Sequence, residues 1–341
     1  MNDLRIGFIG AGEIAAYALP VLDADPTVKL VAVADVNIDA ARKFAERKPG
    51  AQAHADYREL LARPDVDVVY IATPPFLHRQ MLLDSIAANK HILCEKPFVM
   101  NLDEAREVAK VAKTKPKLKI GSCSSRFLTA SGHLARDLIQ SKKLGDITHI
   151  RFISTQPGRP RTMNPGGWKS DAGKSGGGLV MDWCCYDIDY LTFLLGPGYR
   201  PAAILGSTNA PREQMEAGYT ATILSDTGPW IHLERISGEP GPARASLEIR
   251  GTEGGLDISM TPSAQGPILY RPKEFLVPPD TQPLEAPPVT WQGIHLVPLQ
   301  DLISAIREDR QPFTPPERSL MIHQVLEGIY ASAKTRQLVR V

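Results

Sequence analysis

At 341 residues the chain is longer than a single hydrophobic core usually organises, so two domains are expected. Hydrophobic residues make up 43% and charged residues 23% of the sequence, and the formal net charge is +1, which is typical of an ordinary globular protein. This balance argues against a nucleic-acid-binding or membrane-binding protein.

The N-terminal part of the chain alternates short apolar runs with helical patterns. Strands are expected at residues 4–9, 30–34, 66–72, 91–94 and 118–122, with helices starting at Glu13, Ile38, Leu77 and Asp103. Such alternation is typical of βαβ units, whose crossovers require a parallel sheet with helices on both faces. The sequence therefore predicts a doubly wound α/β domain over residues 1–122.

After residue 122 the rhythm changes. Helices are expected at 133–142 and 180–195, a strand at 147–154, and a Gly- and Pro-rich stretch up to Gly178. Short runs rich in Val, Ile, Thr and Leu from 202 to 270 predict an antiparallel sheet, and the prolines between Pro262 and Pro298 predict edge strands and loops. Helices are expected again at 296–307 and 320–333, the second packing across the sheet. Residues 123–341 thus form an α+β domain with a largely antiparallel open sheet.

Targeting, disulfide and metal signals are weak. The sequence enters its first strand without the regions of a signal peptide, and no segment reaches the roughly 18 apolar residues of a membrane span, so a cytoplasmic protein is expected. The cysteines are Cys94, Cys123, Cys184 and Cys185; they lack C-x-x-C spacing, and two are adjacent. We therefore expect reduced thiols and no bound metal.

A glycine-rich turn follows the first expected strand. Residues 10–15, Gly10-Ala11-Gly12-Glu13-Ile14-Ala15, match the pattern G-x-G-x-x-G/A. In that pattern the first glycine permits a tight turn, the second lets backbone approach a pyrophosphate, and the helix start supplies N–H donors. Because the turn lies between a strand and a helix, it predicts a dinucleotide-binding Rossmann domain. A glycine-rich turn that binds nothing is the alternative.

Asp35 and Val36 follow the second expected strand. Asp35 lies at about the 20-residue distance expected for the carboxylate that binds a ribose 2′-hydroxyl. Its charge would repel a 2′-phosphate, so NAD is favoured, although Arg42 in the next helix leaves NADP open. The alternative role for Asp35 is capping of that helix.

Five segments of the chain resemble a known family. They are Ala72-Thr73-Pro74-Pro75-Phe76-Leu77-His78, Lys90-His91-Ile92-Leu93-Cys94-Glu95-Lys96-Pro97, Ser125-Arg126-Phe127, Trp168 to Asp171, and Gly176-Gly177-Gly178-Leu179-Val180-Met181-Asp182. A Glu-Lys-Pro at the end of a Rossmann strand is the hallmark of the glucose-fructose oxidoreductase/inositol dehydrogenase family, often called Gfo/Idh/MocA. The resemblance covers nearly the whole chain, with its segments in the family's order.

The resemblance implies roles for individual residues. Those that would contact the cofactor are Ala72, Thr73, Pro74, His78, Glu95 and Lys96 in the first domain, and Trp168 and Lys169 in the second. Lys96 would also reach the substrate hydroxyl, and the Lys96–Pro97 peptide is expected to be cis. Judged without the family, Lys169 would be a surface lysine.

The chain departs from the family pattern at one position. Most members have Asp-x-Gly-x-His-x-x-Asp, whereas this chain has Asp182-Trp183-Cys184-Cys185-Tyr186-Asp187-Ile188-Asp189, with tyrosine in place of histidine. Glucose-fructose oxidoreductase and the dimeric dihydrodiol dehydrogenases also carry tyrosine there, so the resemblance still implies catalysis.

Hydride transfer from an alcohol needs a group that accepts the hydroxyl proton. Asp182 and Tyr186 are four residues apart on one expected helix and so share a face, which the glycines at 176–178 would allow close to a ligand. A nearby ammonium such as Lys96 would favour the phenolate, so Lys96 and Tyr186 are the expected proton-handling pair. Asp182, Arg126 and Lys174 would add substrate contacts.

The sequence thus predicts an NAD(P)-dependent dehydrogenase or reductase acting on a sugar, cyclitol or glycoside. Two alternatives stay open, a dinucleotide-binding regulator without turnover and an oxidoreductase that keeps its cofactor bound between two half-reactions. By resemblance, and from the apolar strands of the second domain, a homodimer or homotetramer is expected.

Overall fold

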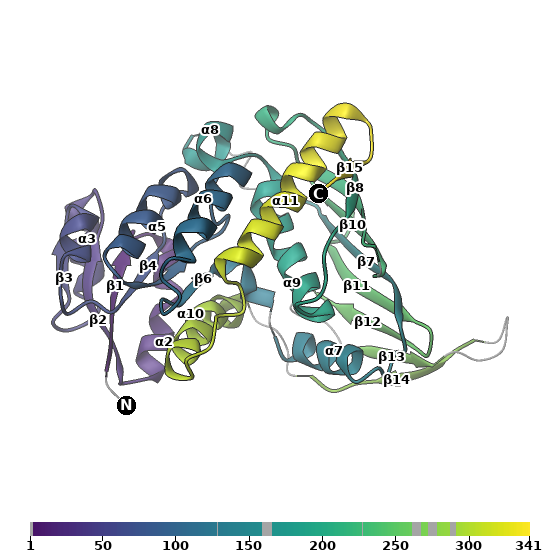
Figure 1. Cartoon of the computed structure of the whole chain (residues 1–341), viewed down its shortest axis with the longest axis horizontal. Helices are drawn as coiled ribbons and strands as arrows, with labels where there is room; N and C mark the ends of the chain where they lie inside the picture. Colours follow the sequence, from purple (N-terminus) through teal and green to yellow (C-terminus); the bar gives the residue numbers. More distant parts are fainter. Residues whose placement is uncertain are drawn as a thin grey trace. The chain divides into compact units, whose positions relative to one another are not determined.

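The computed structural model describes residues 3–127, 129–158, 166–226, 228–260, 267–271, 278–286 and 291–341. The chain divides into two compact units, whose elements Figure 1 labels. The first unit comprises Met1–Arg126 and His295–Met321, and the second comprises Phe127–Ile294 and Ile322–Val341.

A six-stranded parallel sheet forms the centre of the first unit. Its strands are β1 (Leu4–Ile9), β2 (Val28–Ala34), β3 (Gln52–His54), β4 (Val68–Ile71), β5 (His91–Cys94) and β6 (Ile120–Ser122). Their spatial order is β3-β2-β1-β4-β5-β6, and every pair is parallel. This is the Rossmann order, with its switch point between β1 and β4. The predicted doubly wound α/β fold is confirmed.

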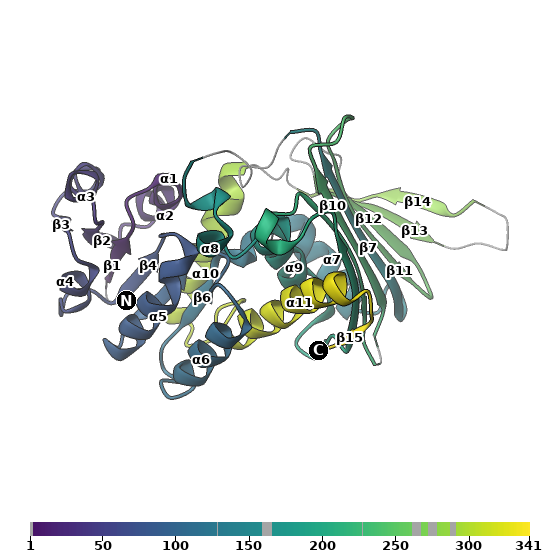
Figure 2. The same ribbon diagram turned by 90° about the horizontal axis from the view of Figure 1, so that it is seen from above.

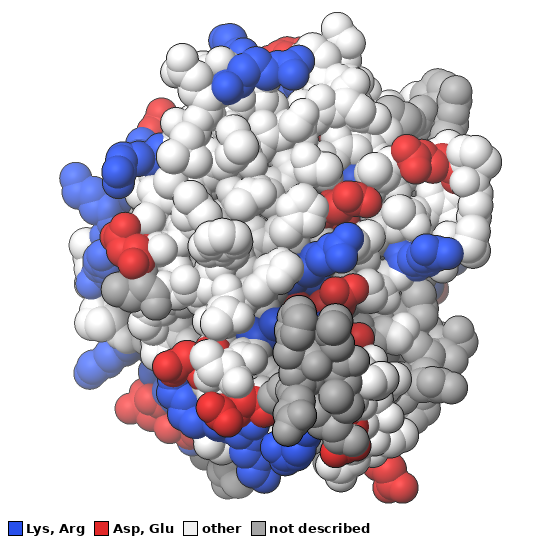
Figure 3. All heavy atoms as spheres, turned by 90° about the vertical axis from the view of Figure 1, so that its right-hand side faces the viewer, with Lys and Arg blue, Asp and Glu red and all other residues white. Residues whose placement is uncertain are grey.

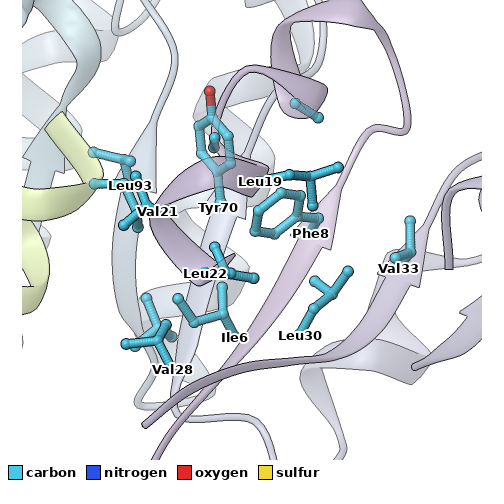
Figure 4. Packing of buried hydrophobic residues seen from close by; sticks show 14 of the residues in the cluster. Ile6, Phe8, Leu19, Val21, Leu22, Val28, Leu30, Val33, Tyr70 and Leu93 are labelled. Carbon is cyan, nitrogen blue, oxygen red and sulfur yellow. The ribbon is translucent and has the colours of Figure 1, made fainter. Parts of the chain in front are cut away.

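Helices cover both faces of this sheet. They are α1 (Glu13–Ala16), α2 (Leu19–Ala24), α3 (Ile38–Ala45), α4 (Tyr57–Leu61), α5 (His78–Ala87), α6 (Leu102–Ala112) and the 3₁₀ turns η1 (Pro75–Leu77) and η2 (Cys123–Phe127). Successive strand residues point to opposite faces, so Phe8 and Tyr70 join one core whereas Ile9 and Ile71 join the other. Figure 4 shows the first of these cores, in which the rings of Phe8 and Tyr70 meet edge to face at 5.1 Å.

A late segment of the chain returns to the first unit. Helix α10 (Trp291–Arg307) buries Leu299, Leu302 and Ile303 in the core beside β1 and α2. Arg307 pairs with Asp25 at 2.7 Å. The expected division at residue 122 had placed this segment with the second domain. The prolines up to Pro298 also suggested loops where the helix already begins, because Pro298 lies inside it.

Three local differences from the sequence prediction concern short elements. Strand β3 and helix α4 were not expected, since three and five residues are too few to show a period. The helix expected from Glu13 ends at Ala16, and α2 starts anew with Pro20 in its first turn. Helix α7 (Ala130–Gln140) begins three residues before the expected 133, because Thr129 caps it by accepting from the Gly132 N–H.

The second unit contains a nine-stranded sheet. Its strands are β7 (Ile147–Gln156), β8 (Ala203–Thr208), β9 (Gly218–Leu224), β10 (Trp230–Ser237), β11 (Arg244–Gly251), β12 (Gly255–Ser259), β13 (Ile268–Arg271), β14 (Asp280–Pro283) and β15 (Val339–Arg340). Their order is β14-β13-β12-β11-β7-β10-β9-β8-β15, and β7 and β10 run parallel in an otherwise antiparallel sheet. The largely antiparallel sheet is confirmed, and β14 lies at its edge.

Helices of the second unit cover one face of this sheet. Helices α7, α9 (Cys185–Leu195) and the part of α11 (Pro316–Thr335) from Ile322 onward lie on that face (Figure 2). The opposite face carries no helix from the described ranges. None of the helices in those ranges combines the length and apolarity that crossing a bilayer would need.

Candidate active site

The glycine turn lies at the carboxyl end of β1. Gly10 has a φ of 98°, and a Cβ atom there would lie 2.5 Å from the Ala72 carbonyl oxygen. Gly12 caps α1 in an extended conformation, and a Cβ atom there would meet nothing within 4 Å. The first glycine is therefore required by the fold, whereas the second leaves open space over the start of α1, before Glu13 and Ile14. This is the fit expected for a pyrophosphate.

Asp35 accepts two backbone hydrogen bonds at the end of β2. One carboxylate oxygen accepts from the Ala11 N–H and the other from the Asn37 N–H, both at 2.9 Å. A carboxylate has more lone pairs than these two bonds use, so ribose hydroxyls can still donate to it. The capping of α3 is done by Asn37 rather than by Asp35. Val36 is 95% exposed beside it.

His78 is fully buried between two loops. Its Nε2 lies 2.8 Å from the Thr73 carbonyl oxygen and its Nδ1 lies 3.0 Å from that of Pro97. Burial lowers the pKa of His78. The ring therefore ties the loop after β4, which contains Ala72, Thr73 and Pro74, to the loop after β5. His78 was expected to contact the cofactor. Its position instead suits it to hold these two loops in place.

Glu95 and Lys96 form the loop at the end of β5. The buried Glu95 carboxylate accepts from the Tyr70 hydroxyl at 2.6 Å and from the Lys96 N–H at 3.2 Å. The Lys96–Pro97 peptide is cis, as expected. Lys96 itself is half-buried. Its backbone is thus held by a carboxylate that is fixed in turn by the core residue Tyr70.

The candidate residues of the first unit therefore gather at one edge of its sheet. The turns after β1, β2, β4 and β5 all leave the carboxyl ends of parallel strands. In open α/β sheets this edge, at the switch point of strand order, is where ligands bind.

Three candidate residues of the second unit precede helix α9 in the chain. Trp168 and Lys169 lie in the 3₁₀ turn η4 (Trp168–Ser170), with the Lys169 Nζ 5.5 Å from the Trp168 ring centroid. Lys174 is exposed in α8 (Ala172–Ser175), and its Nζ lies 3.4 Å from an Asp171 carboxylate oxygen. Arg126 belongs to η2, and its side chain lies outside the described residues.

Asp182 lies in a π-helical turn, Val180–Cys184, that leads directly into α9. The sequence had predicted one regular helix here. Asp182 is half-buried, whereas Tyr186, in the first turn of α9, is only 4% exposed. The Tyr186 ring meets that of Trp183 at 5.7 Å. Single π turns within helices occur frequently at functional sites.

The glycines before this turn have a different role from the one expected. A Cβ atom on Gly178 would lie 2.1 Å from the Glu216 carbonyl oxygen, and one on Gly177 would lie 2.3 Å from the Tyr330 hydroxyl. These two glycines therefore allow close packing against protein atoms. The sequence suggested that these glycines leave room for a ligand, but protein atoms fill the space beside them.

Sequence reasoning missed a buried ion pair behind the helix. The Asp187 carboxylate accepts from Arg235 at 2.7 Å and from the Tyr219 hydroxyl at 2.6 Å. The Arg235 guanidinium lies 4.7 Å from the Trp183 ring centroid. A signal existed, because Arg235 falls on the same alternating face of the strand as the inward-facing Ile231 and Leu233. Within the described residues, no group of three or more His, Cys, Asp or Glu could hold a metal ion.

Comparison with known proteins agrees with this geometry. A family model described as an oxidoreductase family with an NAD-binding Rossmann fold matches residues 4–121, and a GFO/IDH/MocA C-terminal domain model matches residues 133–257. A dTDP-3,4-didehydro-2,6-dideoxy-alpha-D-glucose 3-reductase of Actinomadura kijaniata is 32% identical over 82% of this chain and 84% of its own length. A 1,5-anhydro-D-fructose reductase of Ensifer adhaerens is 29% identical over 77% and 78%.

A solved structure supports the fold over the whole chain. Levoglucosan dehydrogenase in complex with NADH and L-sorbose superposes with a TM-score of 0.88 at 20% identity, covering 100% of this chain and 99% of that one.

A sheet in Rossmann order with a glycine turn at its switch point defines the first unit as a dinucleotide-binding domain, and the family model that matches it describes oxidoreductases. The two family matches together span most of the chain. The chain belongs to the GFO/IDH/MocA family of oxidoreductases, and its first unit is the family's NAD-binding domain, as the sequence motifs predicted.

Proposed function

We propose that this protein catalyses hydride transfer between a nicotinamide dinucleotide and a secondary alcohol or ketone of a sugar, a cyclitol or a glycoside. One observation carries the proposal. The open glycine turn and the cis Lys96–Pro97 loop lie at the same ligand-binding edge of the sheet. The relatives named above, which are sugar reductases, support the substrate class.

The chain's own residues must handle the proton of the reacting alcohol. Nicotinamide accepts or donates the hydride and supplies no acid or base. In this proposal Lys96 and Tyr186 form the proton-handling pair, because a nearby ammonium favours a phenolate over a phenol that otherwise titrates near 10. Asp182 orients Lys96 or grips a substrate hydroxyl, and Arg126 and Lys174 add polar contacts. Trp168 and Lys169 are proposed as cofactor contacts from the second unit.

NAD is the proposed cofactor in preference to NADP. The Asp35 carboxylate at the end of β2 would receive hydrogen bonds from the adenosine ribose and repel a 2′-phosphate. The Arg42 guanidinium, which could otherwise bind that phosphate, pairs with the Asp39 carboxylate at 3.1 Å. Both observations support discrimination by charge at this position.

A second candidate function is a dinucleotide-binding regulator without turnover. It is favoured by one observation, the buried Tyr186 in place of the family's usual histidine. A regulator would bind NAD as tightly as an enzyme but would leave every sugar unchanged.

One assay tests both the choice of cofactor and the turnover of substrate. Purified protein is mixed with NAD or NADP and a panel of sugars, inositols and glycosides, and absorbance is followed at the reduced-nicotinamide band. In this assay Tyr186→Phe should lower kcat by roughly 10²- to 10⁴-fold with NAD affinity unchanged, the usual worth of a general acid/base. Tyr186→His, with an unperturbed pKa near 6.5, should retain some activity and move the pH optimum downward. Tight NAD binding without turnover across the panel would favour the regulator.

We further infer that the uncovered face of the nine-stranded sheet packs against a second copy of the chain. Trp230 is 70% exposed there, and Leu205 also points outward, since its strand neighbours Ile204 and Gly206 are buried. Figure 3 shows that uncharged residues form much of this face. Exposed aromatic residues such as Trp230 are enriched at protein–protein interfaces, which supports a homo-oligomer.

A further inference from the structure

A buried carboxylate holds the start of the helix that carries Asp182 and Tyr186. Glu216, which is 0% exposed, accepts from the Gly178 N–H at 3.1 Å and from the Val180 N–H at 2.9 Å. Its backbone carbonyl accepts from the Leu179 N–H at 2.9 Å. One residue therefore binds three consecutive amides at a helix start, where N–H groups have no partners within the helix.

Tyr330 completes this arrangement from helix α11. Its hydroxyl donates to the Glu216 carboxylate at 2.8 Å, on the oxygen that also accepts from Val180. Burial raises the pKa of Glu216, but its three donors favour the charged form, as hydrogen bonds to a carboxylate do. We call Glu216 and Tyr330 together the helix clamp.

The clamp is itself braced by an ion pair. Arg212 donates to both carboxylate oxygens of Glu327, at 2.9 and 3.0 Å, and to the Gly176 carbonyl at 2.5 Å. Its guanidinium lies 4.7 Å from the Tyr330 ring centroid. The turn before the helix is thus fixed from α11 and from the segment that precedes β9.

The position of Asp182 depends directly on this turn. The Asp182 N–H donates to the Gly178 carbonyl at 3.0 Å, so the residue whose amide Glu216 binds also binds Asp182. Gly178 cannot move towards Glu216, because their backbones already pack too closely for a side chain. Displacement of Gly178 would therefore be transmitted to Asp182, and through the π turn to Tyr186.

From this geometry we propose that Glu216 is a positioning residue, which sets the placement of Asp182 and Tyr186 for the reaction through the amides of Gly178 and Val180. This inference rests on the proposed function. Positioning errors of about 1 Å can cost on the order of 10²-fold in rate, so a buried clamp of this kind affects turnover more than cofactor binding.

Glu216→Gln tests the clamp with little change of shape. The amide keeps one oxygen for Val180 and Tyr330 but turns an NH₂ group towards the Gly178 N–H, so that two donors oppose each other. We expect kcat to fall roughly 10- to 100-fold, with the Kd for NAD within about two-fold of the wild type. Tyr330→Phe removes one of the donors to Glu216 and should lower kcat by about 3- to 10-fold, keeping the test available if the first variant does not fold.

Asp301→Asn is the matched control. Asp301 is a buried carboxylate in the first unit that accepts from the Phe313 N–H and from Arg310, both at 2.7 Å. The Asp301→Asn substitution should lower the melting temperature without changing kcat. A wild-type kcat in Glu216→Gln, or an equal loss in Asp301→Asn, would overturn the proposal.

Hydrogen exchange separates this proposal from the proposed function. Glu216→Gln should speed amide exchange at residues 178–182, and Asp301→Asn should leave it unchanged. If the wild type turns over no compound of the panel, the proposed function fails. The positioning role of Glu216 is then tested by hydrogen exchange alone. Amide protection at residues 178–182 in Glu216→Gln equal to that of the wild type would refute it.

Discussion

Two alanine substitutions in the glycine turn separate folding from cofactor binding. Gly10→Ala places a residue with a side chain at a φ of 98° and its Cβ 2.5 Å from the Ala72 carbonyl oxygen. The left-handed conformation costs about 1–2 kcal/mol and the steric overlap about 1–3 kcal/mol more. The free energy of unfolding should therefore fall by at least about 2 kcal/mol.

Gly12→Ala should behave in the opposite way. Gly12 has an extended backbone that alanine also adopts, and its Cβ would meet nothing within 4 Å. Loss of a preferred N-cap residue and the lower entropy of the unfolded chain nearly cancel, so stability should change by less than about 0.5 kcal/mol. A methyl group would, however, stand where a pyrophosphate approaches the backbone. NAD affinity should fall at least about ten-fold, or about 1.4 kcal/mol.

The assay is urea unfolding of both variants alongside NAD titration followed by calorimetry. The expected pattern is a destabilised Gly10→Ala and a stable Gly12→Ala with weakened NAD binding. If Gly12→Ala binds NAD with wild-type affinity, the pyrophosphate does not pass over this turn. If it loses as much stability as Gly10→Ala, the open space inferred at Gly12 is wrong.

Three further predictions concern Asp35, His323 and Trp230. Asp35→Ser should relax the preference for NAD towards NADP and weaken binding overall, because the Ala11 N–H also loses its acceptor; a wild type that already prefers NADP contradicts this. Burial lowers the pKa of His323 to about 3. Between pH 6.5 and pH 3 this imidazole is therefore protonated in the unfolded chain and neutral in the folded chain. Stability should then fall as pH drops from 6.5 towards 3, by roughly 3 kcal/mol at pH 4.5 from this group, and His323→Leu should flatten the melting temperature over that range. Trp230→Glu should shift light scattering from oligomer to monomer, and a wild type that is monomeric at micromolar concentration counts against the assembly.

The sequence predicted the fold best where periodicity was long. The alternating runs of the first unit identified five of its strands, whereas β3 and α4 were not predicted because both are too short to show a period. The helix expected at 296–307 starts later than α10, which begins at Trp291, because the prolines up to Pro298 indicated loops before it. Its place in the first unit depends on Leu299 and Leu302 packing on a distant core, which no local pattern reveals.

Motifs located the candidate site residues but not the groups that support them. The glycine turn, Asp35 and the Glu95-Lys96-Pro97 loop can be identified because their spacing along the chain is fixed. Glu216 acts on Gly178, 38 residues earlier, and its other partner, Tyr330, lies 114 residues later. Such pairings exist only in three dimensions, so a single glutamate before a strand gives no signal.

Two buried carboxylates flank the part of the helix that carries Asp182 and Tyr186. Glu216 binds the amides before it, and Asp187, directly after Tyr186, binds Arg235 and Tyr219. Buried charges are a weak source of stability, because well-packed apolar residues often replace them without loss. Their presence on both sides of one short segment is better explained by a need to fix its geometry. A reacting group requires that fixation, and an ordinary core helix does not. This fixation supports the proposed function, in which the exchange of histidine for tyrosine changes the acid/base group and does not abolish catalysis.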